Sequence, residues 1–126
     1  MKDKLLALAE RVEAGERDLT RSPAHEGFGE QIAYALGGKM NEIINAWKAT
    51  SYGSLDAAKA LHDAVLPDWE WGYDNLNDEQ CAFVRHKTEG KLVEVHRAPS
   101  VAAAWVAAIL RAKADMSVKE TSDVDA

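Results

Sequence analysis

Residues 54–73, SLDAAKALHDAVLPDWEWGY, decide the fold. Ser54 is a favourable N-cap, because its hydroxyl accepts a hydrogen bond from a backbone N–H group in the first turn of a helix. Apolar residues then recur at helical spacing until Pro67, which cannot continue a helix. Aromatic residues follow at every second position, namely Trp69, Trp71 and Tyr73. This alternation is typical of a strand with one buried face, so the stretch predicts a capped helix that leads directly into a strand.

The polar positions of this strand are acidic and consist of Asp68, Glu70 and Asp74. Alternation places them on the face opposite the aromatic residues. Such acids usually form a solvated face or guard a sheet edge against aggregation, and the alternative is a docking patch for a basic partner. Because unpaired buried carboxylates are costly, we expect this strand at an edge of the sheet, or with its acidic face uncovered.

Two further strands are predicted, over 81–86 and 92–96. A two-residue loop at 89–90 would place Arg85 opposite Glu94 and gather the valines on one face, which favours this register over a slip of one residue. Short loops between successive strands indicate an antiparallel meander.

Helices are predicted on both sides of these strands. Apolar residues at spacings of three and four predict a helical hairpin over 2–36 and a short third helix over 39–50. After the strands, residues 99–100 open a last, alanine-rich helix over 101–114. The polar residues 115–126 are expected to form a flexible tail.

The predicted element order is α-α-(α)-α-β-β-β-α, where the bracketed helix is the short one. This order defines an α+β fold with a three-stranded antiparallel meander, and with helices over one or both faces of the sheet. The chain has 126 residues, enough for one domain. We place that domain at 1–114, with its core unit at 54–114.

Bulk composition narrows the classes of function. The net charge is −6, whereas nucleic-acid binding needs clustered Lys and Arg. Double-stranded-RNA-binding domains share the helix–three strands–helix order but need basic residues where the last helix starts, and residues 99–103 contain none. The chain shows no signal-peptide pattern, no long apolar run and a single cysteine. These features favour a reducing compartment, the cytoplasm.

Few residues suit catalysis or metal binding. The chain has four histidines, His25, His62, His86 and His96. A zinc site needs several ligands that converge on one point, but the predicted register puts His86 and His96 on opposite faces of the hairpin. Cys81 and His96 could share a face as a dyad, but no third orienting group is evident, so Cys81 is interpreted as a packed thiol. We therefore assign no catalytic residue, metal ligand, cofactor or small-molecule ligand.

The aromatic strand is the best candidate for a functional surface. Aromatic residues at strand period are interpreted mainly as core, although exposed ones could stack on bases or anchor a protein partner. The candidate interaction surface consists of Asp68, Glu70, Trp71, Tyr73 and Asp74.

Several segments resemble the phage ABA sandwich domain, a family of small phage and prophage proteins of uncharacterised function. They are LLALAERVEA at 5–14, SLDAA at 54–58 with its helix up to Leu66-Pro67 and the tryptophan pair, and APS at 98–100 followed by AILRA at 108–112. The similarity covers roughly residues 4–114 and lies in the order and spacing of segments, not in a catalytic motif. Asp68 and the longer hairpin over 80–97 depart from the family pattern.

The resemblance implies a helix–sheet–helix sandwich and a phage origin, but no activity. We therefore expect a non-enzymatic phage or prophage accessory protein in the bacterial cytoplasm. It would act through protein–protein contacts with a partner or with a second copy as a homodimer. The alternative function is a nucleic-acid-binding accessory domain.

Overall fold

The computed structural model describes residues 2–16, 27–74 and 80–125, with side chains of the last helix described as far as Met116. These parts of the chain form five helices and one antiparallel sheet with the strand order β1-β2-β3. The elements are α1 (Lys2–Glu13), α2 (Phe28–Ala35), α3 (Met40–Tyr52), α4 (Leu55–Val65), β1 (Trp69–Asp74), β2 (Gln80–His86), β3 (Leu92–Ala98) and α5 (Val101–Asp125). The α+β class, the antiparallel meander and the predicted element order are confirmed. The third helix is present but is not short, because α3 has 13 residues whereas α2 has 8 and α4 has 11.

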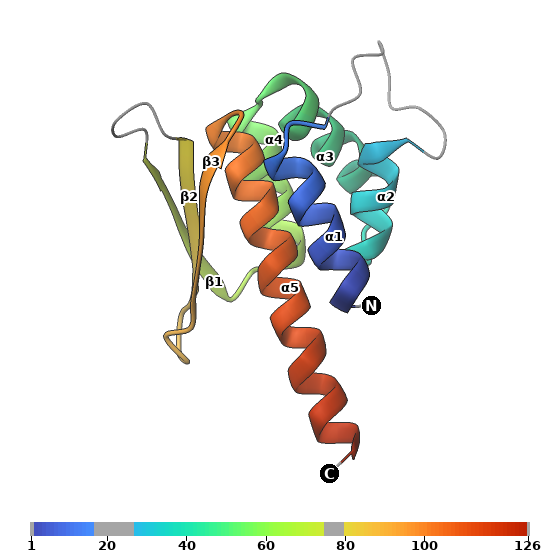
Figure 1. Cartoon of the computed structure of the whole chain (residues 1–126), viewed down its shortest axis with the longest axis vertical. Coiled ribbons are helices and arrows are strands. Elements are labelled where there is room, and N and C mark those ends of the chain that lie inside the picture. Colours follow the sequence, from blue (N-terminus) through green and yellow to red (C-terminus); the bar gives the residue numbers. More distant parts are fainter. Residues whose placement is uncertain (1, 17–26, 75–79, 126) are drawn as a thin grey trace.

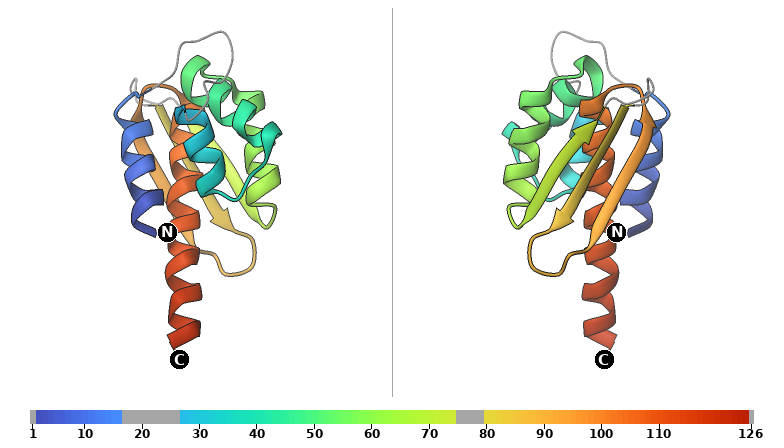
Figure 2. Two further views of the ribbon diagram at one scale, coloured as in Figure 1. Left: turned by 90° about the vertical axis from the view of Figure 1, so that its right-hand side faces the viewer. Right: turned by 90° about the vertical axis from the view of Figure 1, so that its left-hand side faces the viewer.

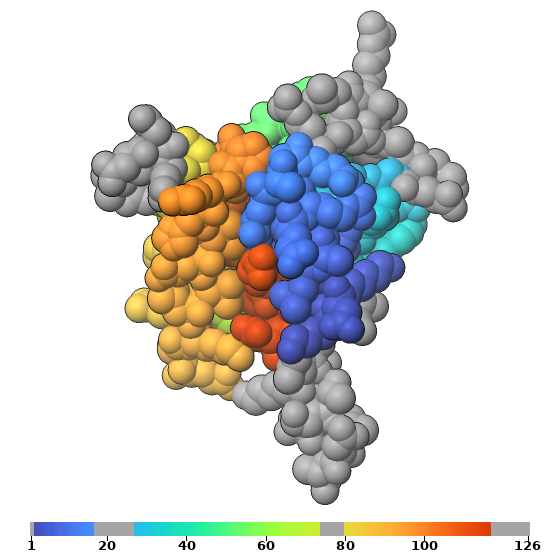
Figure 3. Space-filling model, in the orientation of Figure 1, coloured from blue at the N-terminus to red at the C-terminus, as the bar shows by residue number. Residues whose placement is uncertain are grey.

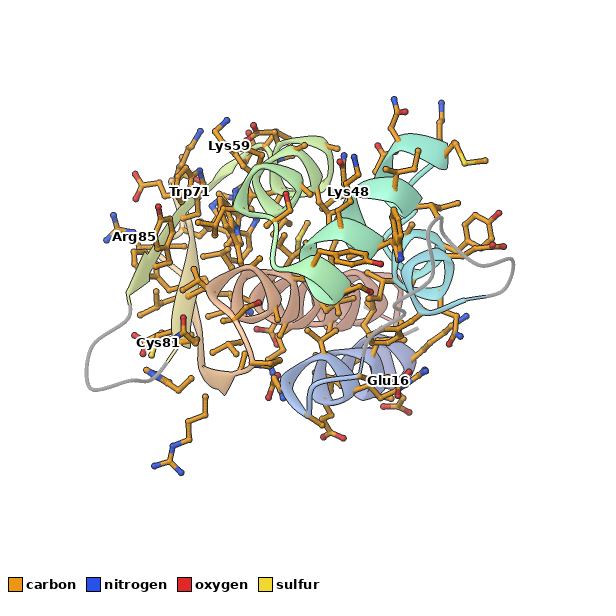
Figure 4. The ribbon with its side chains drawn as sticks, turned by 90° about the horizontal axis from the view of Figure 1, so that it is seen from above. Glu16, Lys48, Lys59, Trp71, Cys81 and Arg85 are labelled. Carbon is orange, nitrogen blue, oxygen red and sulfur yellow. The ribbon has the colours of Figure 1, made fainter. Side chains whose placement is uncertain are left out.

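Helix α5 lies at the centre of the molecule (Figure 1). The sheet packs on one side of it, α1, α3 and α4 contact it from other directions, and α2 lies beside α3 (Figure 4). The described helices all lie behind the same face of the sheet, as the right-hand view of Figure 2 shows. Within the described residues the sandwich therefore has helices on one side of the sheet only. Its other face carries exposed charged side chains, among them Glu70, Arg85 and Glu94, which favour water over a helix.

The core is built around the alanine-rich half of α5. Residues 102–110 are all at most 1% exposed, and Figure 3 shows only a narrow strip of α5 between β3 and α1. Alanine side chains allow neighbouring elements to approach closely, and Trp105 supplies the largest buried volume. One hydrophobic cluster extends from α1 to Ala114, so all described elements share one core.

The predicted helix starts carry the expected side-chain caps. Ser54 Oγ accepts a hydrogen bond from the N–H group of Ala57 at 3.1 Å, and Ser100 Oγ accepts one from Ala103 at 3.0 Å. Each serine therefore satisfies one of the N–H groups that have no partner inside the helix.

Helices α1 and α2 touch each other, but the main support of α1 is α5. The Arg11 guanidinium lies 4.7 Å from the centre of the Phe28 ring, which joins α1 to α2. On the other side, Arg111 of α5 donates to both carboxylate oxygens of Glu13, at 2.7 and 3.1 Å. Of the two helices predicted over 2–36, α1 therefore packs mainly on α5, whereas α2 packs on α3.

The β2–β3 register differs from the predicted one by two residues. Val84 lies opposite Val93. Arg85 lies opposite Leu92, so its predicted pairing with Glu94 is wrong. Because the difference is an even number of residues, each side chain keeps its predicted face.

The loop explains this difference in register. The His86 N–H group donates to Lys91 O at 2.9 Å, so the loop comprises the four residues 87–90 rather than two. Gly90 supplies the left-handed conformation, with φ of +70°, and the His86 ring accepts a hydrogen bond from the Glu89 N–H group at 3.1 Å. A Glu-Gly pair specifies a two-residue turn only weakly, and here the His86 side chain holds the longer loop.

Helix α5 is longer than predicted. It ends at Asp125, whereas the prediction ended it near Ala114 and made 115–126 a tail. Residues 114–125 contain neither Gly nor Pro, so nothing in their composition stops the backbone from continuing as a helix. No helix in the described ranges is long and apolar enough to cross a membrane.

Candidate functional site at the open edge of the sheet

Strand β1 is an edge strand, as expected from its acidic residues, because β2 is its only neighbour in the sheet that the described residues form. The Lys87 N–H group donates to Asp68 O at 3.0 Å, so the main chain of Asp68 faces β2. Main-chain groups alternate in direction along an antiparallel strand. The N–H and C=O groups of Trp71 and Tyr73 therefore point away from β2, towards the open edge.

The next outward-facing residue, Trp69, already has partners on that edge. Its N–H group donates to Leu66 O at 3.1 Å, and its carbonyl accepts a hydrogen bond from His62 Nε2 at 2.8 Å. These partners belong to the C-terminal end of α4 and the residue after it, so the outward main-chain groups of Trp69 are already hydrogen-bonded. Across residues 2–16, 27–74 and 80–125, the part of this edge without a neighbouring strand is consequently the segment 71–73.

The aromatic side chains of β1 change from core to surface along the strand. Trp69 is 4% exposed, Trp71 is 38% exposed and Tyr73 is 50% exposed. The rings of Trp71 and Tyr73 are nearly parallel, with an interplanar angle of 3° and centroids 6.1 Å apart. The prediction that the aromatic residues form core is thus right for Trp69 alone. The other two form an exposed aromatic pair, defined here as Trp71 and Tyr73.

A buried support lies under the aromatic pair. The Trp105 ring centre is 4.4 Å from that of Trp71 and 6.2 Å from that of Tyr73. Trp105 Nε1 donates to His62 Nδ1 at 3.1 Å, and His62 is 1% exposed. Because His62 donates through Nε2 and accepts through Nδ1, both ring nitrogens are satisfied in the neutral form. The aromatic pair therefore sits on a rigid hydrogen-bonded base.

Burial lowers the pKa of His62 below its ordinary value. The hydrogen bond to Trp69 O and the charge of Asp63 oppose this shift, whereas Lys87 and Lys59 add to it. Desolvation is the largest of these effects because it disfavours the charged imidazolium. His62 is consequently neutral in the folded protein near pH 7.

The acidic residues of β1 are exposed where their side chains are described. Glu70 forms an ion pair with Arg85 of β2, with Nε to Oε2 at 3.2 Å, whereas Asp68 has no ion pair among the described side chains. The side chain of Asp74 lies outside the described set. The expected uncovered face is therefore present, although Arg85 offsets one of its acids; Figure 4 shows Arg85 and Trp71 near each other on the sheet.

The open face of the sheet brings together a second group of side chains. Cys81 Sγ lies 3.3 Å from His96 Nδ1, and His96 Nε2 lies 3.1 Å from Glu94 Oε2. The shared face of Cys81 and His96 was predicted, but the third member, Glu94, was missed. Its position two residues before His96 on one strand was the available signal, because residues i and i+2 share a face.

The histidines were also considered as metal ligands. In the ranges that the structure describes, no group of three or more His, Cys, Asp or Glu side chains is placed to hold a metal ion. His25 lies outside those ranges. The His86 ring contacts that of Trp69 edge to face, with ring centres 5.3 Å apart. It lies on the face opposite His96, as predicted.

Two residues of the support were missed by sequence reasoning. Trp105 and His62 are 43 positions apart in the chain, and no local pattern connects a tryptophan in an alanine-rich helix with a histidine in another helix.

Comparison with protein-family models, curated proteins and solved structures found no match for this chain.

Proposed function

We propose that this protein is a non-enzymatic interaction module that binds an extended segment of a partner protein along β1. The observation that carries the proposal is the exposed aromatic pair on an edge strand. Within the described parts of the chain, the outward main-chain groups at 71 and 73 of this strand have no neighbouring strand. Edge strands recruit extended peptides through main-chain hydrogen bonds, and adjacent side chains provide selectivity.

The aromatic pair supports this role because it lies beside the open edge. A bound strand would place alternate side chains over Trp71 and Tyr73, which Trp105 supports from below. Trp and Tyr are enriched among residues that dominate binding energy, because they bury much area and lose little conformational freedom.

A partner segment suits this edge better than a second copy of the chain. Antiparallel pairing of two β1 strands about Trp71 would set Asp68 opposite Asp74. If Gly72 instead lay opposite Gly72 of the second copy, Glu70 would lie opposite Asp74. If the two copies of Glu70 lay opposite each other, two carboxylates would again face one another. Like charges directly opposite each other destabilise a strand pair.

The same charges define the partner's chemistry. The strand that would bind carries apolar side chains on the face of the aromatic pair and Lys or Arg on the opposite face, near the acidic positions of β1. The net charge of −6 favours the approach of a basic segment over an acidic one.

The biological setting rests on the sequence alone. The resemblance in 5–14, 54–67 and 98–112 supports a phage or prophage accessory protein, and the single cysteine supports the bacterial cytoplasm. We accordingly propose a phage-encoded adaptor that acts inside the host cell.

Selection from a display library of short random peptides tests the function. We expect enriched peptides with period-two alternation of basic and apolar residues. Their affinity should fall at least about tenfold in a Trp71→Ala/Tyr73→Ala variant and stay unchanged in Tyr34→Ala, which removes an exposed aromatic ring from α2.

Three outcomes of the binding experiments would contradict the proposal. They are no enrichment, enriched peptides whose affinity ignores the double substitution, and salt-dependent binding of a short oligothymidylate to the aromatic pair, which would assign the surface to nucleic acid. A concentration-dependent dimer that the double variant abolishes would instead assign the edge to a second copy and would also overturn the partner-segment proposal.

A further inference from the structure

The open face of the sheet carries a chain of three side chains with the connectivity of an activated nucleophile. Cys81 Sγ, His96 Nδ1 and Glu94 Oε2 are linked through the imidazole at 3.3 and 3.1 Å. A nucleophile within hydrogen-bond reach of a base, which a third group orients in turn, is the arrangement that activates thiols and hydroxyls in proteins. This cluster does not belong to the aromatic pair, which lies on the other face.

The carboxylate determines the tautomer of His96. Glu94 in its ionised form only accepts hydrogen bonds, so the proton of the neutral imidazole resides on Nε2. Nδ1 then presents its lone pair to the thiol, and the Cys81 S–H group donates to it. Glu94 is thus a positioning residue, and His96 is the base that faces the reacting sulfur.

The register of the sheet holds this geometry. Continuing the Ala82–Val95 pair by one residue sets Cys81 opposite His96. Arg85 pairs with β1 through its main chain, so by alternation the main chain of Cys81 also faces β1. Its pair with His96 is therefore of the type without mutual hydrogen bonds, in which side chains approach more closely.

A β-bulge lies at this position. The register shifts between Ala82 and Gln80, and Arg97 takes a left-handed conformation with φ of +64°. Bulges end regular pairing and re-aim neighbouring side chains, and non-glycine residues with positive φ carry a cost. The regular ladder thus ends at the Ala82–Val95 pair, and Cys81 and His96 lie next to it at the bulge.

We propose that Cys81 is a reactive thiol that exchanges with small disulfides, with His96 as its base. In this step the S–H proton passes to His96 Nδ1 as the sulfur attacks one sulfur of the disulfide. The old S–S bond breaks as the bond to Cys81 forms, and the released thiolate takes up a proton from the imidazolium. The product is a mixed disulfide on the open face and one small thiol.

The surroundings select this chemistry over acyl transfer. The side chains of His96 and Glu94 are 57% and 50% exposed, so the base lies on an open surface. Acyl transfer needs donors preorganised around an oxyanion, whereas thiol–disulfide exchange needs only a thiolate and access to one sulfur.

The rate of reaction with oxidised glutathione, followed by intact mass, tests the proposal. At pH 7 the wild-type thiol should react at least about tenfold faster than the cysteine of N-acetylcysteine. His96→Gln should remove this advantage, and Glu94→Gln should reduce it severalfold. Asp63→Asn is the matched control, since it removes one exposed carboxylate that bonds to Lys59 on α4, and its rate should equal that of the wild type.

The pH dependence separates a base from a merely structural residue. The ratio of wild-type to His96→Gln rates should fall towards one at pH 10, where thiols ionise without help. Thermal melts establish that each variant is folded. A wild-type rate equal to that of N-acetylcysteine would overturn the proposal, and so would a rate ratio that stays constant with pH.

Discussion

His62 connects the buried core to the surface at which a partner is proposed to bind. It accepts a hydrogen bond from Trp105 and donates one to the carbonyl of Trp69. Protonation of His62 Nδ1 would place its N–H group against the N–H group of Trp105 and so break the hydrogen bond between them. The support beneath the aromatic pair therefore depends on the protonation state of His62.

Stability should therefore depend on pH through His62. Its folded-state pKa is lowered below the unfolded value of about 6.5. A group shifted in this direction stabilises the fold fully above the unfolded pKa, and this contribution is lost as the pH falls through the folded pKa. His62→Leu should cost about 1–3 kcal/mol at pH 7.5, because the Trp105 N–H group loses its partner.

The measurement is urea unfolding of both proteins between pH 7.5 and 4.5. The difference in unfolding free energy between wild type and His62→Leu should shrink as the pH falls. Comparing the two proteins removes the contribution of the carboxylates, which both share. A difference that is constant across this range would show that His62 does not titrate with folding.

At the scale of elements, the crossing of α2 and α3 depends on one missing side chain. A Cβ atom at Gly29 would lie 2.9 Å from Trp47 Cβ and 3.1 Å from the carbonyl oxygen of Ile43. Both contacts involve atoms near the α3 backbone, which cannot rotate away. We expect Gly29→Ala to destabilise the protein by about 1–3 kcal/mol, measured by denaturant unfolding. Tyr34→Ala on the exposed side of α2 should stay within about 0.5 kcal/mol of wild type, and an equal loss in both variants would refute the close crossing.

The extent of α5 gives a second prediction at this scale. Among the side chains that the structure describes, the buried core ends at Ala114, and Met116 only packs against it. Removing residues 117–126 should therefore shift the melting temperature by no more than about 2 °C. A drop several times larger would mean that the helix beyond Met116 supports the fold.

Local patterns predicted the elements well, and contacts between distant segments decided what they missed. The serine caps at 54 and 100 and the alternation in β1 follow from backbone chemistry, so they could be read from neighbouring residues. The register of the hairpin could not, because a hydrogen bond from the His86 ring stabilises a longer loop. The length of α5 was underestimated because polarity was taken to mean disorder, although no residue there breaks a helix.

At the candidate site, local pattern likewise predicted the faces of β1 but not the exposure of each side chain. Period two predicted which side chains of β1 share a face, and the acids correctly indicated an edge strand. Exposure along one face could not be predicted from alternation, because it depends on which distant segments of the chain cover each position. Trp69 is therefore core, while Trp71 and Tyr73 reach the surface.

At the scale of the whole molecule, one central helix organises two different surfaces. Helix α5 fills the core and presents Trp105 to the sheet, so the helices need to cover only one face (Figures 1 and 2). The uncovered face carries Cys81, and the uncovered edge carries the aromatic pair. Both surfaces arise because a three-stranded sheet with a single helical layer leaves one face and two edges unprotected.

Amide hydrogen exchange at β1, measured by NMR in the free protein and with a selected peptide bound, tests the central claim most directly. In the free protein the amides of Trp71 and Tyr73 should exchange at least about tenfold faster than those of Glu70 and Gly72, whose main chains face β2. Peptide binding should slow exchange at Trp71 and Tyr73 at least about tenfold. Protection of these two amides in the free protein, or no change when the peptide binds, would contradict an open edge that recruits a partner strand.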